Sequence, residues 1–91
     1  MSVREIEPAL SYVFDRTRTN VYHAEAGQGI PRHEHSYRHA TVCHAGAILI
    51  RKENIERVLR KGDKPALLKE NEWHEIEALE PGTVFANTFL V

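Results

Sequence analysis

The segment from residue 33 to residue 39 reads His33-Glu34-His35-Ser36-Tyr37-Arg38-His39. Its three histidines occupy odd-numbered positions, and alternate residues of a β-strand point to the same face. In a strand the first two would lie roughly 6–7 Å apart, and a bend would be needed to bring in His39. On a helix, positions 33 and 35 would be about 200° apart and would face opposite ways. The spacing therefore favours β-structure together with a bound metal ion, since neutral imidazoles are common ligands of transition metals.

The composition of the 91 residues narrows the class of protein. The length fits one domain with a thin core, so support from a metal ion or a second subunit is plausible. The chain has 12 Lys and Arg against 13 Asp and Glu, which gives no electrostatic reason to expect binding to nucleic acid or to an anionic membrane. No apolar run is long enough to span a membrane, and the charged N-terminus does not resemble a signal peptide. The one cysteine, Cys43, cannot form an internal disulfide, and we expect a cytoplasmic protein.

Most of the chain has the pattern of short strands separated by turns. Segments 10–14, 19–23 and 83–91 are rich in β-branched and aromatic residues, and 39–50 continues as a strand pair bent at Gly46. Two segments look helical instead. Apolar residues in 53–61 recur at i, i+3 and i+4, and 71–79 combines a candidate N-cap, Asn71, with apolar residues spaced by three. In 71–79 a strand pattern is also present, so the local pattern leaves both alternatives open.

Two spaced motifs resemble those of the cupin superfamily. Gly27-x5-His33-x-His35-x3-His39-x6-Gly46 is similar to the first cupin motif, G-x5-H-x-H-x(3,4)-E-x6-G, with histidine in place of the usual glutamate. The second motif, G-x5-P-x-G-x2-H-x3-N, is matched only loosely, because its proline, glycine and asparagine are replaced by Lys69, Asn71 and Ala78. Its histidine corresponds to His74, and asparagine is a natural substitute for a turn glycine because it tolerates left-handed dihedrals. Together the motifs span residues 27–78.

The resemblance implies an all-β fold, a single double-stranded β-helix (jelly-roll, cupin-like) barrel over residues 10–91, preceded by a loose N-terminal leader over residues 1–9. Segment 71–79 is then a strand rather than a helix, and 53–61 is expected as a strand of a variable hairpin. His33, His35, His39 and His74 are the implied ligands of one divalent transition-metal ion. Four imidazoles suit Mn, Fe, Ni, Zn, Co or Cu, and the sequence does not choose among them.

Several other residues are candidates for a role at the site. Tyr37 and Trp73 lie beside ligand histidines and are the predicted substrate-binding residues, and Arg38 lies at the same bend. Glu72 and Glu75 flank His74 and could orient its ring or accept a proton. His23 and His44 are expected to be solvated, and Cys43 to be a buried structural thiol. The residues predicted to form the barrel core are Phe14, Tyr22, Ile76, Phe85 and Phe89.

Three functions remain open. The first is a small metal-dependent enzyme of the dioxygenase, isomerase or lyase type, acting on a small polar organic molecule. The second is a non-catalytic module that binds or senses a small molecule through the metal, and the third is a structural barrel that the metal only stabilises. Because a thin barrel exposes sheet edges, we also expect a homodimer that buries the apolar residues between Leu10 and Phe14.

Overall fold

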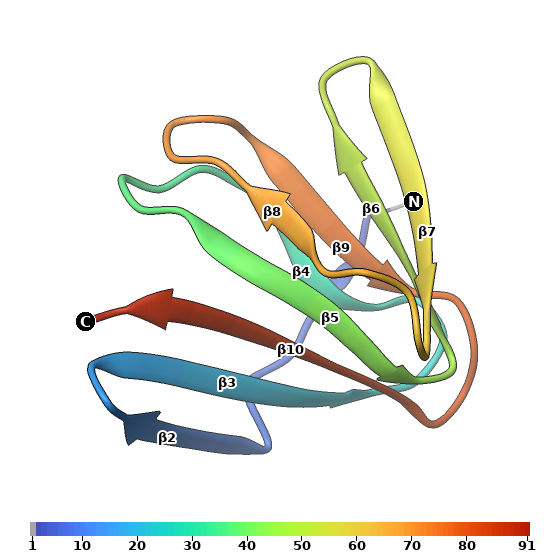
Figure 1. Cartoon of the computed structure of the whole chain (residues 1–91). Helices are drawn as coiled ribbons and strands as arrows, with labels where there is room; N and C mark the ends of the chain where they lie inside the picture. Colours follow the sequence, from blue (N-terminus) through green and yellow to red (C-terminus); the bar gives the residue numbers. More distant parts are fainter. Residues whose placement is uncertain (1) are drawn as a thin grey trace.

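The computed structural model describes residues 2–91, and these residues form ten β-strands and no helix (Figure 1). The predicted all-β class is therefore confirmed. The strands are β1 (Arg4–Glu5), β2 (Leu10–Phe14), β3 (Thr17–Ala24), β4 (Gln28–His33), β5 (His39–Ala45), β6 (Ala47–Lys52), β7 (Ile55–Arg60), β8 (Ala66–Leu68), β9 (His74–Ala78) and β10 (Thr83–Leu90). None of the described residues lies in a helix long and apolar enough to cross a membrane.

The strands form two five-stranded sheets, ordered β1-β4-β9-β6-β7 and β2-β3-β10-β5-β8. Neighbouring strands are antiparallel except for β1, which pairs with β4 in parallel. The two sheets face each other in a jelly roll and spread apart at one end (Figure 1). The predicted barrel is thus an open sandwich, because each sheet keeps its own edge strands instead of closing on the other.

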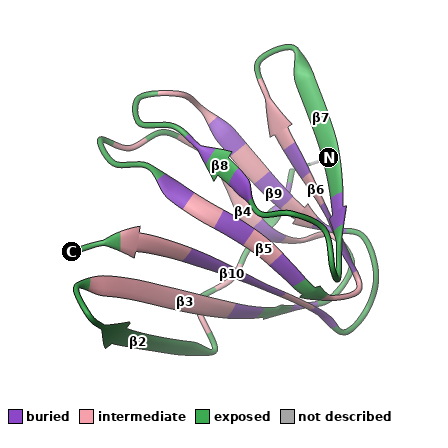
Figure 2. Cartoon of the chain, viewed as in Figure 1, coloured by how far each residue is buried: buried purple, intermediate pink, exposed green. Residues whose placement is uncertain are grey.

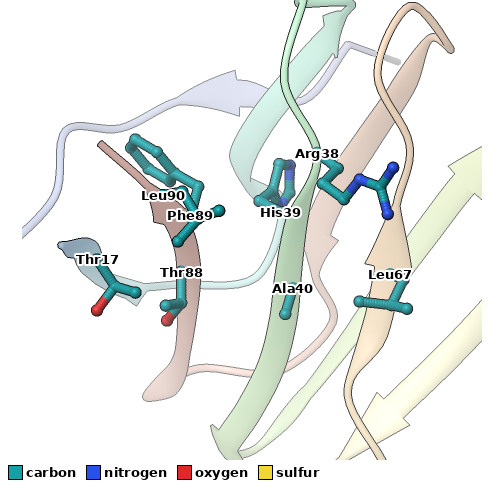
Figure 3. Close-up of a pocket in the computed structure, with 8 residues that line it drawn as sticks. All are labelled: Thr17, Arg38, His39, Ala40, Leu67, Thr88, Phe89 and Leu90. Carbon is teal, nitrogen blue, oxygen red and sulfur yellow. The ribbon is translucent and has the colours of Figure 1, made fainter. Parts of the chain in front are cut away.

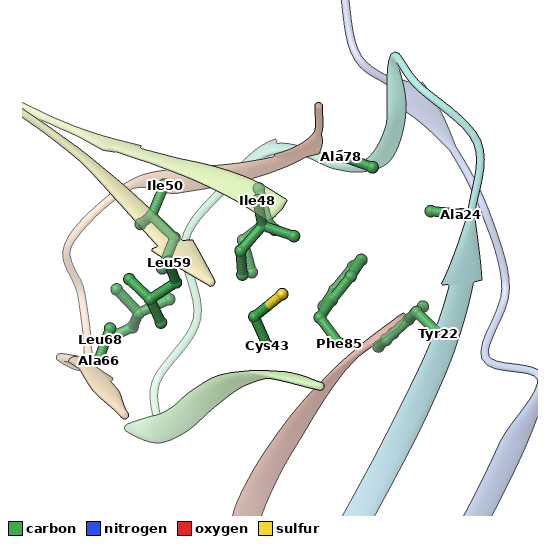
Figure 4. Packing of buried hydrophobic residues seen from close by; sticks show 11 residues of the cluster. Tyr22, Ala24, Cys43, Ile48, Ile50, Leu59, Ala66, Leu68, Ala78 and Phe85 are labelled. Carbon is green, nitrogen blue, oxygen red and sulfur yellow. The ribbon is translucent and has the colours of Figure 1, made fainter. Parts of the chain in front are cut away.

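The core fills the space between the two sheets with large apolar side chains (Figure 4). The Tyr22 and Phe85 rings stack there with centroids 4.8 Å apart, and Ile76 is fully buried, so these three core predictions are confirmed. The prediction for Phe14 is wrong, since it is 74% exposed on β2, an edge strand whose residues are all exposed (Figure 2). Phe89 is half-buried.

Both segments with a helical pattern are strands, as the motif resemblance implied. β9 lies between β4 and β6, and its alternate residues His74, Ile76 and Ala78 are buried. Pairing on both sides of β9 satisfies its backbone groups, and this tertiary context overrides the local helical propensity. β7 pairs with β6 along its whole length.

The segment predicted as a loose leader contains a short strand, β1. Arg4 and Glu5 extend the first sheet by pairing with Gln28 and Gly29, and Val3 is only 6% exposed. The alternation of charged residues in this short segment gave little sign of a strand, because a parallel partner is needed to make it one.

The chain passes from one sheet to the other at Gly46, between β5 and β6. Its φ is +71°, and a Cβ atom added there would lie 2.3 Å from Thr83 Oγ1. We expect Gly46→Ala to lower the free energy of unfolding by about 2–3 kcal/mol, measured by urea denaturation, because backbone strain and a steric clash add.

Gly82 provides a matched control, since its φ is +70° and nothing lies within 4 Å of an added Cβ. Gly82→Ala should cost only about 1 kcal/mol, from the positive φ alone. Equal losses for the two variants would show that the contact with Thr83 is not the cause.

Candidate metal site

The four predicted ligands converge at one end of the sandwich, and they come from both sheets. His33 ends β4 and His74 begins β9, where they are cross-strand partners in the first sheet. His39 begins β5 of the second sheet. His35 is not on a strand as the odd-position pattern suggested, but in the connection between β4 and β5. This connection makes the bend that brings His39 back to the other rings.

Three of the four imidazoles are close enough to share one ion. His33, His35 and His74 each offer a ligand atom, and these atoms lie within 4.8 Å of one another. His39 joins this group through His74, because the two Nε2 atoms are 3.2 Å apart. Ring centroids in the cluster are separated by 4.4 Å for His33 and His74 and by 5.1 Å for His39 and His74.

Hydrogen bonds determine which nitrogen of three rings carries the proton. The Nδ1 atoms of His33 and His74 lie 2.9 Å and 3.1 Å from the carbonyl oxygens of Pro31 and Glu72. A carbonyl only accepts, so each Nδ1 carries a hydrogen and each neutral ring has its lone pair on Nε2.

His39 also carries its hydrogen on Nδ1, because of a hydrogen bond to the buried hydroxyl of Thr41. The Thr41 hydroxyl donates to Asn87 Oδ1 at 2.6 Å and lies 3.1 Å from His39 Nδ1. Because its only hydrogen is already used, the Thr41 oxygen accepts from His39 Nδ1, which leaves the lone pair of His39 on Nε2.

The resulting arrangement fits a metal ion. Two lone pairs, on His39 Nε2 and His74 Nε2, face each other at 3.2 Å with no hydrogen between them, which is unfavourable unless a cation lies nearby. Two nitrogens about 2.1 Å from one ion, at an angle of about 100°, would be about 3.2 Å apart. His35 Nδ1 is also buried without a hydrogen-bond partner.

The electrostatics keep the rings in the ligating form. Burial, reinforced by the neighbouring imidazoles, lowers the pKa of His39 to about 3. Burial and the nearby His33 lower the pKa of His74 to about 4, and burial lowers the pKa of His35 as well. Metal binding requires neutral imidazole, so these rings need not lose protons near pH 7 before they bind an ion.

Two contacts hold the connection between β4 and β5, which carries His35, in place. The backbone N–H of Asn71 donates to the backbone carbonyl of His35 at 2.7 Å. Asn71 has a φ of +60°, as expected for a residue in place of a turn glycine. The ring of Tyr37 stacks on His35 with centroids 4.1 Å apart and an interplanar angle of 8°. Tyr37 also contacts Phe89, at 4.9 Å between centroids.

The other residues next to the ligands have different neighbours from those the sequence suggested. The Arg32 guanidinium lies 4.1 Å from the centroid of the Trp73 ring. Glu75 pairs with Arg51 at 2.9 Å. The Glu72 carboxylate lies 3.3 Å from Lys52 Nζ, and it is the Glu72 carbonyl, not the carboxylate, that orients His74.

The remaining histidines and the cysteine lie outside the cluster. His23 on β3 and His44 on β5 are exposed. Cys43 is 1% exposed, its thiol donates to the Ala45 carbonyl at 3.3 Å, and burial raises its pKa. These features agree with the predicted solvated histidines and structural thiol.

Sequence reasoning missed Thr41 and Asn87, which connect His39 to β10. Both are buried, and their cross-strand pairing places them side by side on the inner face of the second sheet. The sequence did contain a sign of this connection. Thr41 lies between His39 and Cys43 in the alternate positions of β5 that face the core, and a polar residue at such a position needs a hydrogen-bond partner.

We expect Thr41→Val to weaken metal binding about 10- to 100-fold, because His39 loses the acceptor that keeps its proton on Nδ1. Thr41→Ser should restore most of the affinity, as it keeps the hydroxyl. The measurement is a competition titration against a chelator of known affinity. Thr19→Val is the matched control, since Thr19 bonds only Thr88 at 3.1 Å; an equal loss in this variant would contradict the role of Thr41.

Comparisons with known proteins support the fold. No protein-family model and no curated protein matches the sequence. Among solved structures, KdgF from Halomonas sp. has a TM-score of 0.78 and 20% identity, covering 87% of this chain and 73% of that one. A cupin-2 domain containing protein from Shewanella frigidimarina has a TM-score of 0.75 and 13% identity over 94% and 84% of the two chains. A conserved protein with a double-stranded beta-helix domain from Klebsiella pneumoniae has a TM-score of 0.73 and 24% identity over 92% and 72%. The chain thus has the double-stranded β-helix fold of cupin-2 domain proteins.

Proposed function

We propose that this chain is a small metal-dependent enzyme of the dioxygenase, isomerase or lyase type, which acts on a small polar organic molecule. His33, His35, His39 and His74 hold one divalent transition-metal ion. The observation that carries the proposal is the convergence of ring nitrogens without hydrogens, above all the 3.2 Å separation of His39 Nε2 and His74 Nε2.

The arrangement of the rings favours an ion with room for a further ligand. Ring contacts with centroids 4.4–5.1 Å apart connect every pair in the cluster except His33 with His39. In a closed tetrahedral site the six ligand pairs would be equivalent, so the lack of a ring contact between His33 and His39 favours a higher coordination number with open positions.

A divalent ion with four neutral ligands would keep its full double charge, so it would polarise a carbonyl group or acidify a bound water. Hydrogen bonds from the protein's own groups orient the histidine rings. The Thr41 oxygen keeps the proton of His39 on Nδ1, and the carbonyls of Pro31 and Glu72 do the same for His33 and His74.

Tyr37 is the better of the two proposed substrate contacts. Its ring stacks on His35 and is 43% exposed, so it offers an aromatic surface and a hydroxyl beside the cluster. Trp73, which precedes His74 in the chain, is the second proposed contact, although its ring packs against Arg32.

A non-catalytic module that binds or senses a small molecule through the metal is the second candidate. The observation in its favour is that the two carboxylates flanking His74 are engaged by cations, Glu72 by Lys52 and Glu75 by Arg51. An ion pair disfavours the role of general base, so proton transfer would depend mainly on the ion and its water.

The test begins with elemental analysis of the purified protein, followed by substitution with Co²⁺, whose absorption spectrum reports coordination number. Addition of azide or oxalate should change this spectrum if positions are open. Turnover of a panel of small hydroxy- and keto-acids would then support the enzyme, and spectral change without turnover of any compound would favour the binding module. A tetrahedral Co²⁺ spectrum that does not change when azide or oxalate is added would overturn both the enzyme and the binding module. The ion would then be structural.

A further inference from the structure

The outer face of the β2-β3-β10-β5-β8 sheet carries no charged side chain on its strands. Inward-facing residues such as Tyr22, Phe85 and Cys43 form the core, so the alternate residues of each strand point outward. On β2 these are Leu10, Tyr12 and Phe14, which pair with Val21, Thr19 and Thr17 of β3. The same parity on β10, β5 and β8 gives only apolar residues, threonine and histidine.

The outer face of the other sheet has the opposite character. Arg51 lies there within 2.9 Å of Glu75 and 2.8 Å of Glu77, and it also pairs with Glu56 at 3.4 Å. One outer face of this sandwich therefore carries the ion pairs typical of a solvated sheet, while the other is uncharged. Such a difference between two faces of one small domain marks the uncharged face as the one that is covered.

The uncharged face has both a protruding side chain and a recess. Phe14 is 74% exposed, and Leu67 and Leu90 are 66% and 78% exposed. Between these two leucines lies a recess of about 220 Å³, bordered by Thr88 and Ala40 (Figure 3). The one charged group at its rim, Arg38, is paired with Glu70 at 3.3 Å.

We propose that this face is the interface of a homodimer in which the outer faces of two β2-β3-β10-β5-β8 sheets pack against each other. In a twofold dimer each residue near the axis meets its own copy, so a charge there would face a like charge, and a face without charges avoids this repulsion. A different protein partner is more often marked by complementary charge. Neither argument depends on the proposed metal chemistry.

The size of the face agrees with a stable dimer. Five outward side chains, Leu10, Tyr12, Phe14, Leu67 and Leu90, are 47–78% exposed, and with their half-buried neighbours they offer on the order of 700 Å² per copy, close to the roughly 800 Å² per partner of a stable interface. Sheet-on-sheet packing with side chains interdigitating is a common geometry for such surfaces. In this dimer the recess would be filled by an apolar side chain of the second copy.

The experiment measures mass by light scattering and the dissociation constant by sedimentation equilibrium on the full chain. The wild type should have about twice the 10.4 kDa mass of one chain at micromolar concentration. Leu67→Lys and Leu90→Lys each place a charge beside the recess and should raise the dissociation constant at least 100-fold. Val58→Lys is the matched control, because Val58 is a 45% exposed apolar residue on β7 of the other sheet.

Both leucines are largely exposed, so the variants should fold as the wild type does, which circular dichroism and thermal unfolding will verify. A monomeric wild type would overturn the proposal. So would a dimer that survives both leucine variants, because it would then use another surface, such as pairing of the β2 edges. Dissociation caused equally by Val58→Lys would likewise count against this face.

Discussion

Substitution of His74 by alanine is expected to reduce metal affinity by at least about 1000-fold, since a ligand and not a supporting group is lost. His74 is the central member of the cluster. Its ring lies 4.4 Å from His33, 5.0 Å from His35 and 5.1 Å from His39, measured between centroids. Calorimetric titration with Mn²⁺ and Zn²⁺, and elemental analysis after dialysis, measure the effect.

The control is His44→Ala, which removes an exposed histidine from β5 and should leave the affinity unchanged. Because His74 is itself fully buried, circular dichroism must show that the variant still folds. Retention of one ion per chain at wild-type affinity in His74→Ala would exclude this cluster as the metal site.

The metal-free protein is expected to lose stability steeply below about pH 6.5. The pKa values of His39 and His74 fall from 6.5 to about 3 and about 4 in the folded chain. Above pH 6.5 both rings are neutral in the folded and the unfolded states. Between pH 6.5 and pH 4 only the unfolded chain takes up these two protons, so acid favours unfolding. The free energy of unfolding should fall by up to about 1.4 kcal/mol per pH unit for each proton, or about 2.7 kcal/mol for both.

Urea denaturation in the presence of chelator, at pH values from 4 to 8, measures this slope. Carboxylates also titrate near pH 4, and His39→Gln separates the contributions because it keeps the carboxylates and removes one histidine. The variant should have a smaller slope between pH 6 and 5 than the wild type, because one of the histidines with a lowered pKa is removed. Identical slopes would mean that His39 is protonated in the folded chain.

The fold could be predicted mainly from the spacing of a few residues. Gly46 and the three histidines of segment 33–39 indicated a β-structure that bends twice, and β4, β5 and β6 agree with this. Local pattern alone would have assigned a helix to segment 71–79, where the cross-strand pairing of β9 prevails. The exposure of Phe14 could not be predicted, since an aromatic residue in a strand has the same signature whether its face meets the core or another surface.

The histidines of the candidate site were predictable from the sequence, but their hydrogen bonds were not. The sequence identified the four histidines, and the structure brings their rings together. It did not reveal that His35 lies off the strand, because the strand pattern requires only that the histidines occupy alternate positions. It also did not reveal the connection from His39 through Thr41 to Asn87, since the partner lies on a strand 46 residues away in the chain.

The division of the ligands between two sheets has a consequence for the motions of the molecule. His33 and His74 belong to one sheet and His39 to the other, and the sandwich spreads apart at one end (Figure 1). An ion bound to all of them would cross-link the two sheets, which otherwise contact each other only through side-chain packing. Partial opening of the sandwich at this end would then require the ion to leave. Amide hydrogens of the first residues of β5 and β9 would exchange with solvent at a rate governed by ion release instead of by fraying of the strands.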